Sequence, residues 1–118
     1  VTTNLFGDIL SDESSQVVGG LGMAPAANIG DNFALFEPVH GAAFDIAGQN
    51  IANPSSFLLS IKLMLDWLGA KHNDSKCFEV GAKLESVIFD LVKSGVKTKD
   101  IGGDATTIEF TRHITDNL

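Results

Sequence analysis

Four stretches of the chain place apolar residues at the spacing of a helix that buries one face. The first covers residues 6–18, and Gly7 or Asp8 can begin it. The run Val1–Asn4 before it is rich in β-branched residues, which is typical of a strand. The chain is therefore expected to pass from a strand into a helix within its first ten residues.

Glycine and proline interrupt this pattern at two places. Residues 19–25 hold three glycines and a proline and cannot continue a helix, so we place a hinge or domain boundary near Val18. Residues 34–40 indicate a short strand that ends in a loop, and residues 41–53 continue as a loop. The loop closes at an Asn-Pro pair, after which the helical pattern resumes.

The second helix is predicted from Pro54 to about Leu68, with Asn53 as its cap. Its buried stripe is expected to comprise Phe57, Ile61, Met64, Leu65 and Leu68. A third helix is predicted over residues 75–93. A fourth begins between Asp104 and Thr107, where Thr106 and Glu109 have capping-box spacing. Helices thus dominate, with two or three strands.

Composition limits the classes of partner. The chain has 118 residues, enough for one ordinary domain, and a net charge of −7, which repels phosphate backbones and anionic lipid surfaces. Nucleic acid and membranes are therefore excluded as expected partners. Cys77 cannot form an internal disulfide, and no signal segment precedes the first helix, so a cytoplasmic location is expected.

Asp8 and Asp12 stand four residues apart, so both carboxylates leave the same face of the first helix. Hard oxygen ligands of this kind suit Mg²⁺ or Mn²⁺. On spacing alone, however, a solvated helix face explains such a pair more often than a metal does. Glu13 points to a different face and is interpreted as a surface acid.

The run Gly19-Gly20-Leu21-Gly22 matches neither standard nucleotide-binding fingerprint. A hinge that needs positive φ values explains its glycines better than a phosphate loop does. The segment from residue 37 to residue 54 gathers chemistry more densely. Its imidazole can stack on a purine, and its amides can form hydrogen bonds with the edge of a base. A carboxylate can accept hydrogen bonds from both ribose hydroxyls, and its negative charge repels a 2′-phosphate.

Each of these loop residues also has an ordinary explanation. His40 can be an imidazole satisfied by the backbone, and Asp45 can be a turn-forming acid. Their density in one loop favours adenosine recognition over those separate explanations. His72 and His113 are interpreted as structural or surface residues, and Cys77 as a small buried hydrophobe.

Six segments together resemble the β-decarboxylating dehydrogenases, the family of 3-isopropylmalate, isocitrate, homoisocitrate and tartrate dehydrogenases. In chain order they are NLFGDILSD (4–12), GGLGMAPAANIG (19–30), FEPVHG (36–41), DIAG (45–48), IANP (51–54) and GGDATT (102–107). The resemblance implies the C-terminal portion of the α/β isocitrate/isopropylmalate dehydrogenase fold, helix-rich with few strands. It also implies that residues 1–18 end a smaller dimerisation domain and that residues 19–118 belong to the large NAD-binding domain.

The resemblance further implies that Asp8 and Asp12 hold Mg²⁺ or Mn²⁺. Family members that prefer NADP carry Lys-Tyr where this chain has Asp45-Ile46, so NAD is the expected cofactor. Phe44 departs from the proline that commonly precedes the acid. The implied cofactor-binding residues are His40, Gly41, Ala43, Asp45, Ile46, Asn53, Gly20, Leu21 and Gly22.

The implied reaction is oxidation and decarboxylation of a 3-substituted malate by a homo-oligomeric, full-length enzyme. The family's arginines, catalytic tyrosine and other catalytic groups would precede Val1, so the fragment alone is expected to be inactive and to contain no catalytic residue. Two alternatives remain: a non-catalytic nucleotide-binding fragment or regulatory subunit module, and a generic helical interaction domain. The cues for substrate conflict, so the malate is left open.

Overall fold

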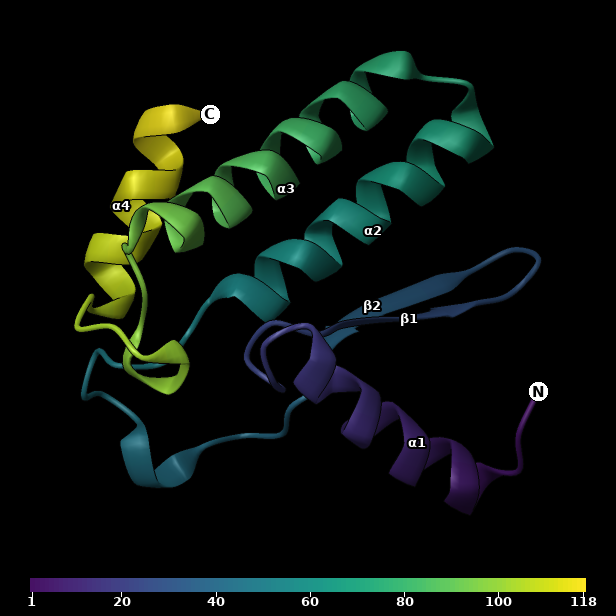
Figure 1. Ribbon diagram of the computed structural model, residues 1–118. Helices are drawn as coiled ribbons and strands as arrows, with labels where there is room; N and C mark the ends of the chain where they lie inside the picture. The colour runs from purple at the N-terminus through teal and green to yellow at the C-terminus, as the bar shows by residue number, and fades with distance from the viewer.

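The computed structural model describes residues 1–118 (Figure 1). Its elements are helix α1 (Asn4–Val17), strands β1 (Pro25–Ile29) and β2 (Ala34–Pro38), the 3-10 turn η1 (Phe44–Ile46), helices α2 (Ser55–His72) and α3 (Ser75–Ser94), the 3-10 turn η2 (Lys99–Ile101) and helix α4 (Thr107–Asn117). Helices α2 and α3 run antiparallel, α4 packs against α3, and the β1–β2 hairpin packs against α2.

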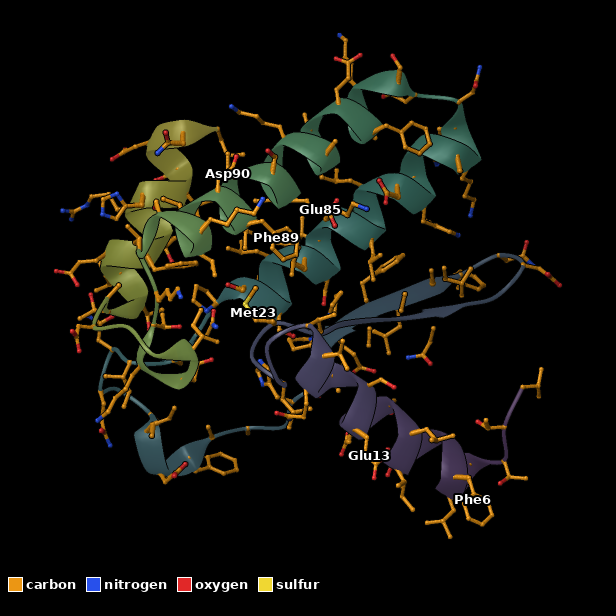
Figure 2. The ribbon with its side chains drawn as sticks, viewed as in Figure 1. Phe6, Glu13, Met23, Glu85, Phe89 and Asp90 are labelled. Atoms are coloured by element: carbon orange, nitrogen blue, oxygen red, sulfur yellow. The ribbon has the colours of Figure 1, made fainter.

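The core lies where α3 and α4 meet and continues toward the start of α2. Phe110 and Ile88 are completely buried, and Ile114 is almost so. Figure 2 shows Met23 beside the first turns of α2, where it joins this cluster. The other buried members of the cluster are Leu59, Leu84 and Val87. These side chains leave water on folding, which is the main stabilising contribution to this part of the chain.

Helix α2 buries serines on a face next to the predicted hydrophobic stripe. Ser56 Oγ donates to the carbonyl of Ala24, and Ser60 Oγ donates to the carbonyl of Glu37 at 2.8 Å. The hairpin is therefore held by hydroxyl-to-carbonyl bonds as well as by apolar packing. The predicted buried stripe is wrong at Phe57, which is 56% exposed, and its other members are only half-buried: Ile61, Met64, Leu65 and Leu68.

Three elements differ from the prediction. Helix α1 begins at Asn4 rather than at Gly7, so the strand prediction for Val1–Asn4 is wrong; extended Thr3 is the N-cap. Helix α2 continues to His72 and ends where Asn73 adopts a left-handed conformation. Strand β1 was not predicted as a strand; it pairs antiparallel with β2, Ala27 opposite Phe36.

The last two helices begin and end where the sequence predicts. Asp74 accepts a hydrogen bond from the N–H of Lys76, and left-handed Gly95 ends α3. Thr106 and Glu109 form the expected capping box at the start of α4. The Thr106 main-chain N–H donates to the Glu109 carboxylate and holds the pKa of Glu109 below its ordinary value.

The far end of the hairpin is fastened to α2. Lys71 Nζ donates to the carbonyl of Asn32 at 2.9 Å and lies 4.3 Å from the centre of the Trp67 ring. Phe36 of β2 packs on the same ring at 6.1 Å between centroids. This aromatic and cationic group fixes the direction of the hairpin along α2.

Helix α1 stands apart from the other elements. Ser15 is its only buried residue, and no other helix or strand packs against it. Phe6 and Glu13 point away from the rest of the molecule (Figure 2). No helix is both long enough and apolar enough to span a membrane.

One ion pair couples α2 to α3 and gives a pH-dependent stability. Lys62 Nζ lies 2.8 Å from Asp66 Oδ2 and 3.5 Å from Glu85 Oε2. The hydrogen bond to Asp66, partly offset by burial and aided by Glu85, raises the pKa of Lys62 above its ordinary 10.5. When folding raises a lysine pKa, the resulting stabilisation is fully present below the pKa of the unfolded chain. It is lost as the pH rises through the pKa of the folded protein.

We therefore expect the unfolding free energy to fall above pH 10.5 through this group, by less than about 1 kcal/mol because the acids are partly exposed. Urea unfolding at pH 7 to 11 measures the loss. Lys62→Met should remove this part of the slope. Lys93→Met is the control, since Lys93 is 78% exposed and 3.9 Å from Asp90; an equal change in slope for both variants would contradict the assignment.

Candidate functional site

Three hollows meet at His40 and Gly41, directly after β2. The loop cavity, of about 520 Å³, is lined by His40, Gly41, Ala42, Ala43, Ile46, Ala47, Gly48, Asn50, Ala52 and Thr107. The inner cavity, of about 210 Å³, is lined by Gly22, His40, Gly41, Ala43, Ile46, Ile51, Ala52, Asn53 and Asp100. The α1 groove, of about 620 Å³, runs between Asp8 and Ser11 of α1 and the residues of the hairpin.

The near side of the loop cavity is formed by residues 41–49, which make only local hydrogen bonds. The turn η1 closes through bonds from Ile46 N–H to Ala43 and from Ala47 N–H to Phe44. Gln49 Nε2 donates to the main-chain carbonyl of Asp45 at 2.7 Å. The carboxylate of Asp45 makes no hydrogen bond or ion pair within the chain and is exposed at the edge of the loop.

The far side, residues 50–53, is tied to the start of α4. Asn50 adopts a left-handed conformation with φ of 58°, and its carbonyl accepts the Thr107 N–H at 3.0 Å. Its side-chain Oδ1 accepts the Ile108 N–H at 3.1 Å, and Thr107 Oγ1 donates to the carbonyl of Ala52. These bonds satisfy free N–H groups of the first helical turn and fix one wall of the cavity.

The side chain of Asn53 is fully occupied by protein partners. Its Oδ1 accepts the Ser55 N–H at 2.9 Å, but the N-cap residue of α2 is Pro54, so the prediction of Asn53 as the cap and Pro54 as the first helical residue is one residue too early. Its Nδ2 donates to Asp100 Oδ2 at 3.0 Å and approaches Met23 Sδ at 3.6 Å. The main-chain N–H and C=O of Asn53, by contrast, have no partner within the chain.

The glycine turn has two functions in the structure. Gly19 and Gly20 adopt φ values of 114° and 94°, which other residues rarely adopt, so the expected positive φ values are confirmed at these two positions, and the hinge stays a prediction. Gly22 instead lines the inner cavity, where a Cβ atom would meet Asp100 and Asn53. Gly20 and Leu21 line none of the three hollows.

Asp8 and Asp12 lie one turn apart on the exposed face of α1, and their carboxylates form no hydrogen bond or ion pair within the chain. Ser11 and Ser15 bond only the main-chain carbonyls of these residues. Two free carboxylates fit a hard cation that takes its remaining ligands from water or substrate. No third His, Cys, Asp or Glu joins them in a group that could hold a metal.

The structure brings together much of the predicted cofactor set. His40, Gly41, Ala43 and Ile46 line both the loop and inner cavities, and Asn53 and Gly22 line the inner one. Asp8 shares the α1 groove with His40 and Gly41, whereas Asp12 and Asp45 line no hollow. His72 and His113 are exposed and lie outside the site, and Cys77 is half-buried.

Two residues from outside the loop that line the loop or inner cavity are absent from the predicted set. Thr107 and Asp100 reach the cavities from segments more than forty residues beyond the loop, and no local pattern connects them with it. The motif GGDATT (102–107) contains Thr107 and begins two residues after Asp100, but its spacing gives no sign of what it contacts. Their role depends on how α4 and η2 pack.

Known proteins match the chain over its whole length. A family model described as isocitrate/isopropylmalate dehydrogenase matches residues 1–118. The 3-isopropylmalate dehydrogenase of Sulfurisphaera tokodaii is 51% identical over 119 residues, which cover 100% of this chain and 35% of that protein. The isocitrate/homoisocitrate dehydrogenase of Thermus thermophilus is 51% identical over 118 residues, 100% of this chain and 33% of that protein.

Solved structures agree with these relatives. The isocitrate dehydrogenase of Methylococcus capsulatus superposes with a TM-score of 0.88 at 38% identity, over 99% of this chain and 33% of that one. The chain thus spans about a third of the length of the curated relatives it matches. Its fold is a helix-rich portion of the isocitrate dehydrogenase fold, and the chain belongs to the isocitrate/isopropylmalate dehydrogenase family.

Proposed function

We propose that the chain forms part of an oxidoreductase that oxidises and decarboxylates a 3-substituted malate, with NAD and a divalent cation. The observation that carries this proposal is the continuity of the three hollows at His40 and Gly41. They extend from Asp8 on α1 to Thr107 on α4. Such a path suits a long dinucleotide whose reactive end lies near the metal.

The loop supplies groups that distinguish NAD from NADP. The free carboxylate of Asp45 can accept the two ribose hydroxyls and repels a 2′-phosphate. The unpaired N–H and C=O of Asn53 match an acceptor and a donor on the edge of adenine. We assign base recognition to the Asn53 main chain because its carboxamide is already bonded to Asp100 and Ser55.

The metal would be held by Asp8 and Asp12, with water and substrate as the further ligands. When bound, it would polarise the C2 oxygen and stabilise the enolate left by decarboxylation. Both aspartates would hold the cation and would transfer no proton. Proton transfer and substrate binding need groups that this chain lacks, so the 118 residues alone are expected to turn over nothing.

The isolation of α1 supports a division of the chain into two domains. We assign residues 1–18 to a smaller dimerising domain and residues 19–118 to the large cofactor domain of a cytoplasmic homo-oligomer. Leu5, Phe6 and Leu10 of α1 are each more than half exposed, as expected of a surface that another part of the assembly covers.

A chimera tests the proposal, with these 118 residues in place of the matching segment of the Thermus isocitrate/homoisocitrate dehydrogenase. We expect Mn²⁺-dependent NAD reduction with isopropylmalate, isocitrate or homoisocitrate. Asp45→Asn should lower kcat/KM for NAD about tenfold, the effect of a lost charged hydrogen bond. The preference for NAD over NADP should fall with it.

Asp31→Asn is the matched control, because Asp31 is an exposed acid at the tip of the hairpin, away from the three hollows. It should leave both coenzyme constants unchanged. A folded chimera that reduces no coenzyme with any of the three malates would refute the dehydrogenase assignment. Reduction of NADP in preference to NAD would refute the role of Asp45.

A further inference from the structure

Asp100 connects the cofactor loop to a buried part of the chain. Its Oδ2 accepts a hydrogen bond from Asn53 Nδ2 at 3.0 Å, and its Oδ1 accepts one from Thr98 Oγ1 at 2.6 Å. Thr98 is completely buried, and its carbonyl also accepts the N–H groups of Ile101 and Gly103. The carboxylate is therefore held on one side by a rigid turn and holds an amide on the other.

The inner cavity closes around this contact. Gly22, Asn53 and Asp100 reach it from three segments that are distant in the sequence. A Cβ on Gly22 would lie 2.5 Å from Asp100 Oδ2 and 3.3 Å from Asn53, so the three residues already fill the space between them. A shift of any one of them displaces the others.

We propose that Asp100 is a positioning residue for the cofactor site, which it serves by fixing the carboxamide of Asn53. This inference rests on the proposed function. With Nδ2 bonded to Asp100 and Oδ1 bonded to Ser55, the plane of the Asn53 side chain is set. The main-chain N–H and C=O of Asn53 then remain unpaired at the cavity wall, available to a base. Asp100 acts through Asn53 and needs no contact with the cofactor.

Asp100→Asn in the 118-residue chain tests the proposal. The substitution keeps the shape and removes the charge. The new amide can donate to the Thr98 hydroxyl and still accept from Asn53 Nδ2, so the charged hydrogen bond that fixes Asn53 becomes a weaker neutral one. We expect NAD binding, measured by calorimetry, to weaken about fivefold, as when a charged hydrogen bond is replaced by a neutral one. The side-chain NH₂ signals of Asn53 in ¹H–¹⁵N spectra should move.

Asp104→Asn is the matched control, since Asp104 is a nearby exposed acid with no hydrogen bond or ion pair. It removes the same charge and should change neither the Asn53 signals nor the affinity for NAD. Thr98→Val is a second variant that keeps the buried shape and removes only the hydroxyl. It should move the Asn53 signals less and weaken NAD binding about two- to threefold.

The outcomes separate the two proposals. If the unaltered chain binds no NAD, the proposed function loses its support, and the Asn53 signals alone decide the positioning. If it binds NAD and Asp100→Asn binds it equally well with the Asn53 signals unmoved, the positioning role is overturned. Should Asp100→Asn fail to fold, unmoved Asn53 signals in Thr98→Val overturn it as well.

Discussion

Replacing Phe110 with alanine is expected to remove about 3–5 kcal/mol of unfolding free energy, the usual cost of deleting a buried aromatic ring. Phe110 has no exposed surface and packs with Ile88 and Ile114 between α3 and α4. Domain stability is generally only about 5–15 kcal/mol, so the loss is a large fraction of the whole. Urea unfolding followed by circular dichroism measures it.

The same substitution should also affect residues 50–53. Helix α4 holds residues 50–53 through Thr107 and Ile108, so loosening α4 also frees the fixed wall of the loop cavity. Hydrogen exchange at these two amides should speed up in Phe110→Ala. Ile108→Ala is the control, because that side chain is 59% exposed on the same helix. If both variants lost the same unfolding free energy, the assignment of Phe110 to the core would be contradicted.

Gly103→Ala is expected to cost at least about 2 kcal/mol, as overpacking against the main chain does. A Cβ at Gly103 would collide with the carbonyl oxygen of Lys97, the same oxygen that accepts the Ala105 N–H. The backbone at Lys97 cannot move away from the new Cβ as easily as a flexible side chain could. The turn that carries Thr98 must therefore open, and the thermal midpoint should fall accordingly.

Its neighbour Gly102 supplies the comparison. Gly102 has φ of 81°, but a Cβ added there would meet no atom within 4 Å, so Gly102→Ala should cost only about 1 kcal/mol of backbone strain. The order of the two thermal midpoints is the decisive result. A lower midpoint for Gly102→Ala than for Gly103→Ala would contradict the packing described around Lys97.

Local signals predicted α3 and α4 well. The prediction of residues 75–93 differs from α3 by one residue because Asp74 and Gly95, the cap residues, act within their own turns. The capping box at Thr106 and Glu109 is local in the same sense. Such features need no knowledge of the rest of the fold.

Elements whose surroundings come from distant segments were predicted less well. Strand β1 contains the short and weakly alternating run PAANI, and its pairing with β2 decides its conformation. Phe57 is exposed because the hairpin covers the serine face of α2, where Ser56 and Ser60 bond its carbonyls. A hydrophobic pattern cannot identify a buried face made of hydroxyl groups.

The candidate site divides in the same way. His40, Gly41 and Ile46 were found from the density of one loop and its resemblance to a family, and the structure gathers them at the cavities. Asp100 lies 47 residues from Asn53, and its bond to that side chain is created only by tertiary packing. Spacing along the chain holds no information about such a pair.

The two walls of the loop cavity differ in how much backbone entropy they would lose when a ligand binds. Residues 50–53 are already ordered by α4 and η2, whereas residues 41–49 are restrained only by their own turns. Any ligand that closes the cavity must therefore reduce the backbone entropy of one wall and not of the other. The stiffness of residues 41–49 therefore contributes to affinity at this site, so relatives with identical contacts but a more rigid loop should bind the same ligand more strongly.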